Sequence, residues 1–375
     1  MKKKVIIFSH YVDNDNNYLQ YTHSQAKQFN KMGYDVIVFA PKGIKSLKDL
    51  FSRVKVSIID EIKVINSKRI PFGSFLINSK LNINGLFYYL SIRKKVRNIL
   101  NNGDVLFLNA HNFHCEGYAA YLFKKKYNNI KVTITFHGSD LESELSNKNS
   151  IDRLVKVSKV IDYYVCVSDK LTNKLKNINI SNVKTIYNGF ENYELPEVQK
   201  EKIFITVADL IKLKNIDILI DAFSIIFKKY DDYKLKIVGD GPLKSELLTK
   251  VKKYNLEDKI YFTGMIPNKQ VFNELNKAFC FILTSSPEGF GIVYLEAMNC
   301  KCITIGTKGE GIDGFIKNGD NGFLVNINAN EIANLILGIL NNKYDLNTVI
   351  NNGYISAKQL TWERNVKEYV ELVKY

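Results

Sequence analysis

The sequence has few of the features that mark secreted or metal-binding proteins. Its 375 residues include only five cysteines, an odd number, and these lie mostly in or beside apolar runs. We therefore expect reduced, buried thiols and no disulfide framework. Cys300 and Cys302 are separated by one residue and have no histidine nearby, which is not a zinc or redox spacing. The cysteines thus give no reason to expect a metal site.

Long hydrophobic runs are also missing. No stretch approaches the roughly 18 uninterrupted apolar residues of a membrane span. The basic start, Met1 to Lys4, leads into only five apolar or small residues before His10, which is too short for a signal peptide. We expect a cytoplasmic chain that is neither secreted nor membrane-spanning.

What the sequence does have is enough apolar material for two cores, with 46% hydrophobic and 12% aromatic residues. Short apolar runs alternate with helical patterns, which indicates parallel sheets covered on both faces. A polar, proline-containing stretch over 188–200 breaks this rhythm and is the predicted linker. We predict an α/β protein with two Rossmann-like, doubly wound domains, 1–190 and 200–359, facing each other across a cleft. The expected strands cover 4–9, 35–40, 104–109, 131–136, 163–168, 183–187, 203–208, 234–239, 260–263, 280–284, 302–306 and 323–325.

The formal charge of +15 is unevenly distributed. Residues 1–190 carry 30 Lys and Arg against 14 Asp and Glu, whereas residues 191–375 carry 23 against 24. The run 93–97, with four basic residues, lies in a segment rich in Leu, Ile, Phe and Tyr, as in a basic amphipathic face. Such a face would dock on anionic lipid or on an acidic acceptor, although a merely solvated charged face is the alternative. No RNP-like motif, zinc finger or KH loop is present, so nucleic acid is disfavoured as the partner.

The most informative segment runs from Ser285 to Met298. The apolar run before it predicts a buried strand, and 292–298 has helical spacing. Glu288 therefore lies in a strand-to-helix loop. Gly289 and Gly291 let this loop turn tightly and approach a ligand, and the free amides at the helix start favour an anion.

Glu296 follows Glu288 by eight positions and lies inside the predicted helix. Both carboxylates can then face one ligand, and carboxylates suit hydroxyl groups because they offer only acceptors. A glutamate in the first helical turn is also ordinary capping electrostatics. The spacing alone leaves both interpretations open.

The sequence of this segment resembles the donor-site signature of glycosyltransferase family 4, which consists of retaining enzymes of the GT-B fold. The resemblance rests on EGFG at 288–291 and LEAM at 295–298, and it covers most of the chain. It implies a GT-B architecture whose second domain binds a nucleoside-diphosphate sugar and whose last helix, over 360–375, packs back on the first domain. No cofactor is expected beyond this sugar nucleotide, which is a substrate.

The resemblance also implies roles for individual residues. Glu288 would orient the donor sugar and Glu296 would hold the ribose, with the backbone at Gly289, Phe290 and Gly291 beside the donor. In the family's diphosphate-binding segment an Arg and a Lys hold the donor. Lys214 matches the Lys, but Asp209 stands at the Arg position, so we expect Lys212 to supply the missing charge; the alternative is that both are exposed loop lysines.

Two further segments resemble donor-binding loops. Ile266 lies in the stretch that matches the loop whose backbone meets the base. Glu310 and Gly311 belong to a formal G-x-G-x-x-G at 309–314, which we do not interpret as a dinucleotide fingerprint because an Asn-Gly turn follows within about ten residues. The resemblance places them beside the donor phosphates and sugar, where we expect a helix start.

In the first half, the strand ending at Phe136 leads into His137, which matches the family's histidine-glycine element. The resemblance implies that His137 contacts the transferred sugar, with Asp140 and His111 on the acceptor side. A lone histidine after a strand is otherwise a structural hydrogen-bonder. The D-x-D of Asp13–Asp15 imitates a metal-binding motif of another glycosyltransferase fold, and we interpret it as a polar loop.

The resemblance implies a retaining, metal-independent glycosyltransferase. It would move a hexosyl-type unit from a nucleoside-diphosphate sugar to a hydroxyl of an anionic lipid-linked or polysaccharide acceptor, in cell-surface glycan synthesis. The basic first domain predicts peripheral association with the inner face of an anionic membrane. Two alternatives stay open: a GT-B sugar-nucleotide epimerase, and a non-catalytic GT-B subunit that supports a partner enzyme.

Overall fold

The computed structural model describes residues 2–10, 20–43, 56–69, 82–193, 196 and 198–374. The polar loop expected at Asp13–Asp15 lies outside these residues. The chain forms two compact units. Unit 1 comprises residues 1–189 and 362–375, and unit 2 comprises residues 190–361.

Unit 1 is built on an eight-stranded sheet with the order β3-β4-β2-β1-β5-β6-β7-β8. Its strands are β1 (Lys4–Phe8), β2 (Asp35–Gly43), β3 (Val56–Ile59), β4 (Ile62–Arg69), β5 (Val105–His111), β6 (Val132–Phe136), β7 (Tyr163–Cys166) and β8 (Val183–Thr185). Its helices are α1 (Gln20–Lys31), α3 (Ile83–Asn102), α4 (Tyr118–Lys126), α5 (Ser139–Leu145), α6 (Lys148–Ser158), α7 (Asp169–Lys176) and α14 (Trp362–Lys374), with a π-helical turn, η2 (Phe113–Gly117).

The pairs in this sheet are parallel except for β3 with β4, a hairpin that the sequence did not predict. The turn consists of Asp60 and Glu61, whose φ angles are 46° and 65°. Two consecutive residues with positive φ form the tight turn that suits the twist of a hairpin. The sequence pattern does not indicate this hairpin, because its turn residues are neither glycine nor asparagine and the exposed β3 lacks a continuous apolar run.

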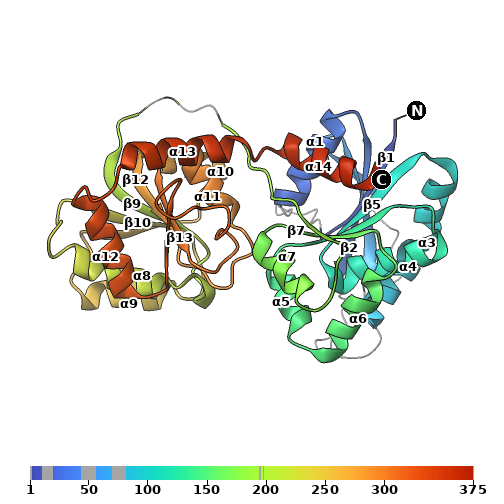
Figure 1. The fold of residues 1–375 in the computed structure, drawn as a ribbon, viewed down its shortest axis with the longest axis horizontal. Helices are drawn as coiled ribbons and strands as arrows, with labels where there is room; N and C mark the ends of the chain where they lie inside the picture. Colours follow the sequence, from blue (N-terminus) through green and yellow to red (C-terminus); the bar gives the residue numbers. More distant parts are fainter. Residues whose placement is uncertain are drawn as a thin grey trace. The chain divides into compact units, whose positions relative to one another are not determined.

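The C-terminal helix belongs to the core of unit 1, although it comes last in the sequence. Val366 and Tyr369 of α14 are buried in one cluster with Val5 and Phe107 of the central strands. Figure 1 shows α14, in red, beside the blue α1, and these two helices pack against each other.

Unit 2 has a six-stranded, all-parallel sheet with the order β11-β10-β9-β12-β13-β14. Its strands are β9 (Glu201–Val207), β10 (Lys234–Val238), β11 (Ile260–Gly264), β12 (Ala278–Ile282), β13 (Ile303–Thr307) and β14 (Phe323–Val325). Its helices are α8 (Ile216–Ile226), α9 (Lys244–Lys253), α10 (Asn268–Lys277), α11 (Ile292–Asn299), α12 (Ala329–Leu340) and α13 (Leu346–Lys358), with a 3₁₀ turn, η3 (Lys212–Lys214).

Helices cover both faces of this second sheet. Figure 1 shows α8, α9 and α12 on one face and α10, α11 and α13 on the other. Strands covered on both sides must be apolar along their whole length, and β13 is buried at all of its positions. The prediction of two parallel-sheet, Rossmann-like domains is confirmed, since all twelve predicted strands are present, within about three residues at their ends.

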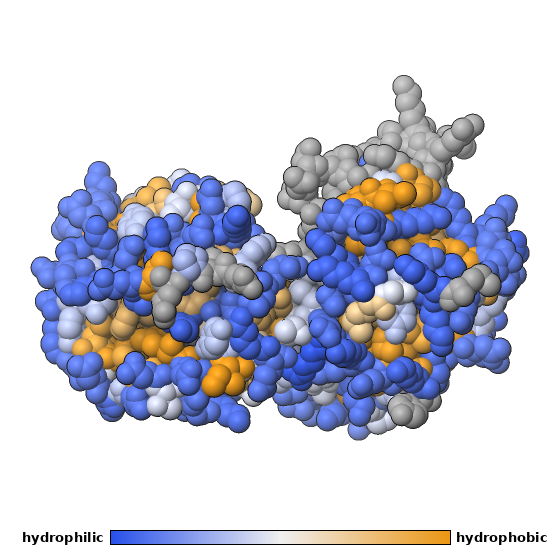
Figure 2. Space-filling model, turned by 90° about the horizontal axis from the view of Figure 1, so that it is seen from above, coloured by the Kyte–Doolittle hydropathy of each residue, from blue (hydrophilic) through white to orange (hydrophobic). Residues whose placement is uncertain are grey.

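Figure 2 shows that the visible face of each unit is mostly hydrophilic, with separate hydrophobic areas. None of the helices within the described ranges combines the length and apolarity needed to cross a membrane. All five cysteines are buried and free, as their place in apolar runs predicted.

Candidate functional site

Three neighbouring strands of unit 2 carry predicted donor-site residues at their carboxyl ends. Lys214 follows β9, Glu288 follows β12 and Glu310 follows β13. Because β9, β12 and β13 are adjacent and parallel, the three loops emerge at the same edge of the sheet. Parallel α/β sheets bind ligands at this edge.

The centre of this cluster is an ion pair. The Nζ atom of Lys214 lies 2.7 Å from Oε2 of Glu288, and the hydroxyl of Ser285 donates to the same oxygen at 2.9 Å. Both charged side chains are largely buried, with 21% and 14% of their surface exposed. The amide of Ser286 also donates to the carbonyl of Leu213 at 2.8 Å, which joins the two loops. The cation and the carboxylate are therefore held in place together.

Glu310 and Gly311 shape the loop that carries Glu288. The carboxylate of Glu310 accepts a hydrogen bond from the Glu288 amide and another from the Ser286 hydroxyl, each 2.7 Å long. The Gly311 amide donates to the Glu288 carbonyl at 3.1 Å. A Cβ at Gly311 would lie 1.9 Å from the carbonyl oxygen of Gly289, so only glycine fits.

The helix start expected at 309–314 was wrong. This segment forms turns, and no helix begins within it. The short spacing to the next strand, β14, leaves room only for turns and isolated bridges. A donor contact of Glu310 and Gly311 stays a prediction.

The helix after Glu288 begins as the sequence predicted. Gly291, with a φ of 79°, is the N-cap of α11. A positive φ at this position strains any residue with a side chain. Phe290, by contrast, is 2% exposed and packs edge-on against Phe315, with ring centroids 6.0 Å apart. A donor contact at Phe290 would therefore come from its backbone.

Glu296 is buried in α11, with 6% of its surface exposed. Burial raises the pKa of this carboxyl to about 7, and the negative charge of Glu191 adds to the rise, while a hydrogen bond from Asn268 opposes it. A buried carboxyl of this kind is costly to ionise. A ligand hydroxyl would relieve that cost, as the predicted ribose contact requires.

The remaining donor-site residues of unit 2 lie at the surface. Lys212 and Asp209 are both exposed in the loop after β9, and Ile266 is half-buried between β11 and α10. Ala208, in the loop after β9, approaches Gly239 so closely that a Cβ on this glycine would lie 1.9 Å from the Ala208 carbonyl oxygen. Compensation of Asp209 by Lys212 stays a prediction.

In unit 1, two histidines meet at the ends of the adjacent strands β5 and β6. Nδ1 of His111 lies 2.8 Å from Nε2 of His137. Burial lowers the pKa of His111 to about 3, and burial together with His111 lowers the pKa of His137. Tyr21 stacks on His137, with ring centroids 3.9 Å apart. The sequence had not indicated Tyr21, since an aromatic residue on an amphipathic helix is ordinary core material.

Asp140 supports the turn that carries His137. Its Oδ1 accepts hydrogen bonds from the amides of His137 and Gly138, at 3.0 and 2.8 Å. Burial raises the pKa of Asp140 to about 6, and these hydrogen bonds oppose the rise. The acceptor-side role predicted for Asp140 and His111 is not tested by these contacts.

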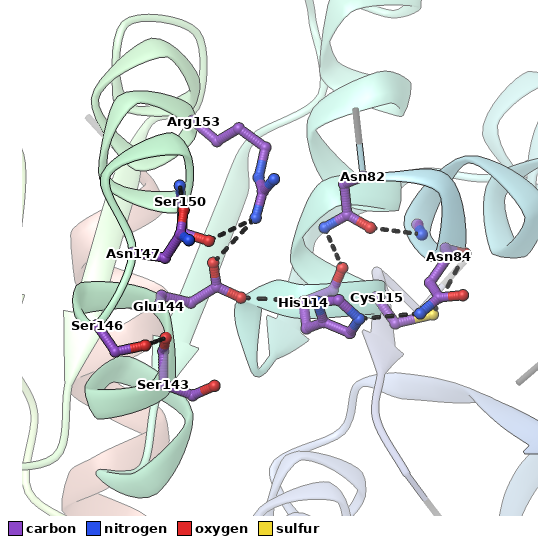
Figure 3. A network of polar contacts seen from close by, with 11 residues as sticks. Asn82, Asn84, His114, Cys115, Ser143, Glu144, Ser146, Asn147, Ser150 and Arg153 are labelled. Atoms are coloured by element: carbon purple, nitrogen blue, oxygen red, sulfur yellow. Dashed lines mark hydrogen bonds and ion pairs between the residues drawn. The ribbon is translucent and has the colours of Figure 1, made fainter. Parts of the chain in front are cut away.

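A second polar network lies beside these residues, and Figure 3 shows it with Glu144 between His114 and Arg153. Oε1 of Glu144 is 3.7 Å from Nδ1 of His114, and Oε2 is 3.5 Å from the Arg153 guanidinium. Asn84 lies 3.0 Å from Nε2 of the same histidine, and Asn82 donates to its carbonyl. The network joins α3, η2, α5 and α6, and it fixes the loops that follow β5 and β6. Its members are far apart in the sequence, so no local pattern could have revealed it.

Comparisons with known proteins agree with this architecture. The family described as Glycosyltransferase Family 4 matches residues 20–192, and the family described as Glycosyl transferases group 1 matches residues 190–356. An uncharacterized glycosyltransferase of Methanocaldococcus jannaschii, MJ1178, is 30% identical over 77% of this chain and 82% of its own length. N-acetyl-alpha-D-glucosaminyl L-malate synthase of Bacillus anthracis is 30% identical over 64% of this chain and 66% of that protein. Poly(ribitol-phosphate) alpha-N-acetylglucosaminyltransferase of Staphylococcus aureus is 30% identical over 52% of this chain and 40% of that protein.

Solved structures show the same fold at lower identity. Sucrose-phosphate synthase from Thermosynechococcus elongatus superposes with a TM-score of 0.77 at 18% identity, over 100% of this chain and 98% of that one. Anabaena Alr3699/HepE in complex with UDP and glucose gives 0.73 at 17% identity, over 99% of both chains.

Two parallel-sheet domains of this kind define the GT-B class of glycosyltransferases. Within that class, the chain belongs to glycosyltransferase family 4.

Proposed function

We propose that this glycosyltransferase moves a hexosyl-type sugar from a nucleoside-diphosphate sugar to a hydroxyl of a lipid-linked or polysaccharide acceptor, in cell-surface glycan synthesis. The observation that carries the proposal is the pairing of Lys214 with Glu288 at 2.7 Å, on adjacent loops at the ligand-binding edge of unit 2. A hydroxyl-rich ligand with a diphosphate needs both an acceptor and a cation. UDP is the nucleotide we favour, since the similar Anabaena structure holds UDP and glucose.

The pair would act on two parts of the donor. Glu288 accepts a hydrogen bond from a hydroxyl of the donor sugar, and Lys214 faces the diphosphate. The bond between the anomeric carbon and the diphosphate oxygen breaks, and a bond from the acceptor oxygen to that carbon forms. The departing diphosphate carries the growing negative charge, and an ammonium placed to meet that charge stabilises the transition state.

We propose retention of the anomeric configuration. Glu288 is engaged with Lys214 and Ser285, so it is placed to orient the sugar and not to attack it. A front-face departure fits this arrangement better than double displacement. In that route the acceptor hydroxyl adds on the face from which the diphosphate leaves, and the diphosphate takes its proton.

We also propose that the diphosphate is neutralised by lysine and not by a metal ion. The proposal rests on Lys214, with Lys212 exposed on the same turn. Transfer should then continue when divalent cations are chelated.

Relatives support the acceptor class. The Staphylococcus aureus relative acts, by its name, on poly(ribitol-phosphate), and the name of the Bacillus anthracis relative gives an N-acetylglucosaminyl L-malate as its product. Poly(ribitol-phosphate) and L-malate both carry hydroxyl groups and negative charge. The excess of basic residues in the first half of the chain, 30 against 14, suits an acceptor of this chemistry.

Several of these basic residues line one hollow of unit 1, which suits an anionic membrane surface. A hollow between α3 and α4, of about 150 Å³, is lined by Tyr89, Arg93, Lys94, Arg97, Phe123, Lys126 and Tyr127. Leu86 and Leu90, each 41% exposed, precede these cations on α3. Positions 86, 90, 93 and 97 recur at helical spacing and so share one face. We propose that this face, with leucines to insert and cations to meet phosphates, binds the membrane peripherally.

A thermal-shift screen against nucleotide sugars tests the proposed function. A ligand that binds only the folded state raises the melting temperature. We expect a UDP-sugar to raise the melting temperature of the wild type more than UDP alone does. In the Glu288→Gln variant, the UDP-sugar should raise it only as much as UDP alone. A flat screen would contradict the proposal. Stabilisation without transfer to any acceptor would instead favour an epimerase or a non-catalytic subunit.

A further inference from the structure

A buried chain of hydrogen bonds connects the C-terminal helix of unit 1 to His137. The Asn365 amide donates to the Tyr187 carbonyl at 2.8 Å, and the Gln25 amide donates to Asn365 Oδ1 at 2.8 Å. Oε1 of Gln25 lies 3.2 Å from Nε2 of His111, and Nδ1 of His111 lies 2.8 Å from Nε2 of His137. The chain links α14, α1, β5 and the turn after β6.

The direction of every bond in this chain follows from its first member. A backbone carbonyl only accepts, so the amide nitrogen of Asn365 faces Tyr187 and its oxygen faces Gln25. The Gln25 nitrogen then donates to Asn365, which turns the Gln25 oxygen toward His111. An amide oxygen only accepts, so Nε2 of His111 carries the proton.

The proton positions in the two histidine rings follow in the same way. A neutral imidazole has one protonated and one bare nitrogen. Both histidines are neutral at pH 7, since burial lowers the pKa of each. Nδ1 of His111 is therefore bare and accepts from Nε2–H of His137. This leaves Nδ1 of His137 as a bare acceptor.

Asn109 offers a competing arrangement of the ring protons. Its oxygen accepts from the hydroxyls of Thr133 and Thr135, at 2.9 Å each, so its nitrogen faces Gln25 Oε1 at 3.3 Å and His111 Nε2 at 3.2 Å. A donation to His111 would reverse the ring protons. It would also set the bare Nε2 against the Gln25 oxygen at 3.2 Å, lone pair to lone pair. When Asn109 and His111 both donate to the Gln25 oxygen, its two lone pairs are satisfied.

We propose that this chain fixes His137 as the Nε2–H tautomer, so that its bare Nδ1 accepts a hydrogen bond from a hydroxyl of the donor sugar. Gln25, His111 and Asn365 are positioning residues in this scheme. Nδ1 of His137 is buried and has no hydrogen-bond partner among the residues that the structure describes. Tyr21 stacks on the ring and limits its rotation. The ligand part of this inference rests on the proposed function.

The bare Nδ1 of His137 should affect which donor sugars are used. A buried acceptor without a donor is costly, and a site built around such a group discriminates against ligands that lack the matching hydroxyl. A donor sugar deoxygenated at the position that meets His137 should therefore be a poor substrate. Its kcat/KM should fall about tenfold or more, as expected for the loss of one such hydrogen bond.

The tautomers can be measured directly in the ligand-free protein. Two-bond ¹H–¹⁵N spectra of the labelled full chain at pH 7 distinguish protonated from bare ring nitrogens, and His111→Gln and His137→Gln variants assign the signals. We expect Nε2–H and bare Nδ1 in both rings. A proton on Nδ1 of His137 would overturn the proposal, whatever the outcome of the donor screen.

Two variants test this chain of hydrogen bonds, which we call the relay. Gln25→Leu removes the acceptor of His111, so Asn109 should donate to His111 and the proton of His137 should move to Nδ1. Thr133→Val is the control, because it removes a buried hydrogen bond to Asn109 but leaves the chain intact. We expect Gln25→Leu to lower kcat/KM for the donor by about tenfold relative to Thr133→Val. Unchanged tautomers in Gln25→Leu would refute the relay, and if that variant does not fold, the wild-type spectrum still decides.

Discussion

Lys214 and Glu288 lie 74 positions apart in the sequence, and their side chains meet at 2.7 Å. Their strands, β9 and β12, are neighbours in a parallel sheet, which brings both loops to one edge. In the absence of donor, each neutralises the other, so neither charge is buried alone. In the proposed complex, a bound diphosphate would contact Lys214 and a sugar hydroxyl would contact Glu288.

The first prediction concerns the two lysines. Lys214→Met should lower kcat/KM by about 100-fold, since it removes a cation from the departing diphosphate. Lys212→Met, on the same turn, is the matched comparison. A smaller effect there would show that Lys214 is the main contact, and equal effects would show that Lys212 compensates for Asp209. No effect of either substitution on steady-state kinetics would contradict the proposed donor site.

Glu296 predicts a pH-dependent stability. Its folded pKa, about 7, lies above the usual 4.5, so the folded state holds the proton more tightly than the unfolded state. The contribution of Glu296 to the free energy of unfolding therefore falls as pH rises from about 4.5 to 7. Above that range the contribution is lost completely, and the loss is on the order of 3 kcal/mol. Glu296→Gln removes this titration. Urea unfolding of both proteins should show curves that diverge between pH 5 and 7, with the variant more stable at pH 7.5; parallel curves would rule the shift out.

Gly311 predicts a steric effect on the Glu288 loop. In Gly311→Ala the new Cβ would lie 1.9 Å from the Gly289 carbonyl oxygen, so the loop must move. We expect a loss of about 2–3 kcal/mol in the free energy of unfolding, together with weaker donor binding. Gly309→Ala is the comparison for backbone strain alone, because Gly309 has a φ of 75° but a Cβ there meets nothing within 4 Å, whereas Gly311 has no positive φ. A loss in Gly311→Ala no larger than the loss in Gly309→Ala would contradict a dominant effect of the close approach.

The basic face of α3 predicts salt-dependent membrane binding. Replacing Arg93, Lys94 and Arg97 by Gln should weaken binding to anionic vesicles about 100-fold, at about 1 kcal/mol for each cation. The matched control replaces the exposed Lys228, Lys252 and Lys253 of unit 2, with the same change in charge. Co-sedimentation at low and high salt measures both. Binding that does not respond to salt, or equal losses in both variants, would refute a specific face.

The sequence predicted most of the fold because buried parallel strands are continuous apolar runs. The segment 278–282 and helix α11 lie almost where their patterns placed them. The β3–β4 hairpin was missed because Asp60 and Glu61 adopt positive φ without the usual glycine or asparagine. Local pattern carries no information about a conformation that long-range pairing imposes.

The site was predictable only in part, and for a similar reason. The resemblance indicated Glu288 and Lys214, but it could not show that the Glu310 carboxylate accepts a hydrogen bond from the Glu288 amide. Nor could it indicate Gln25 and Asn365, which lie 340 positions apart and meet through α14. Such contacts depend on tertiary packing, which leaves no periodic trace in the sequence.

The most direct test of the central claim compares two ligands by calorimetric titration. UDP carries the diphosphate but no sugar, whereas a UDP-sugar carries both. Lys214→Met should weaken binding of both ligands, and Glu288→Gln should weaken only the UDP-sugar while it leaves UDP unchanged. If instead Lys214→Met binds UDP as tightly as the wild type, or Glu288→Gln keeps full affinity for the sugar nucleotide, the pair is not the donor site.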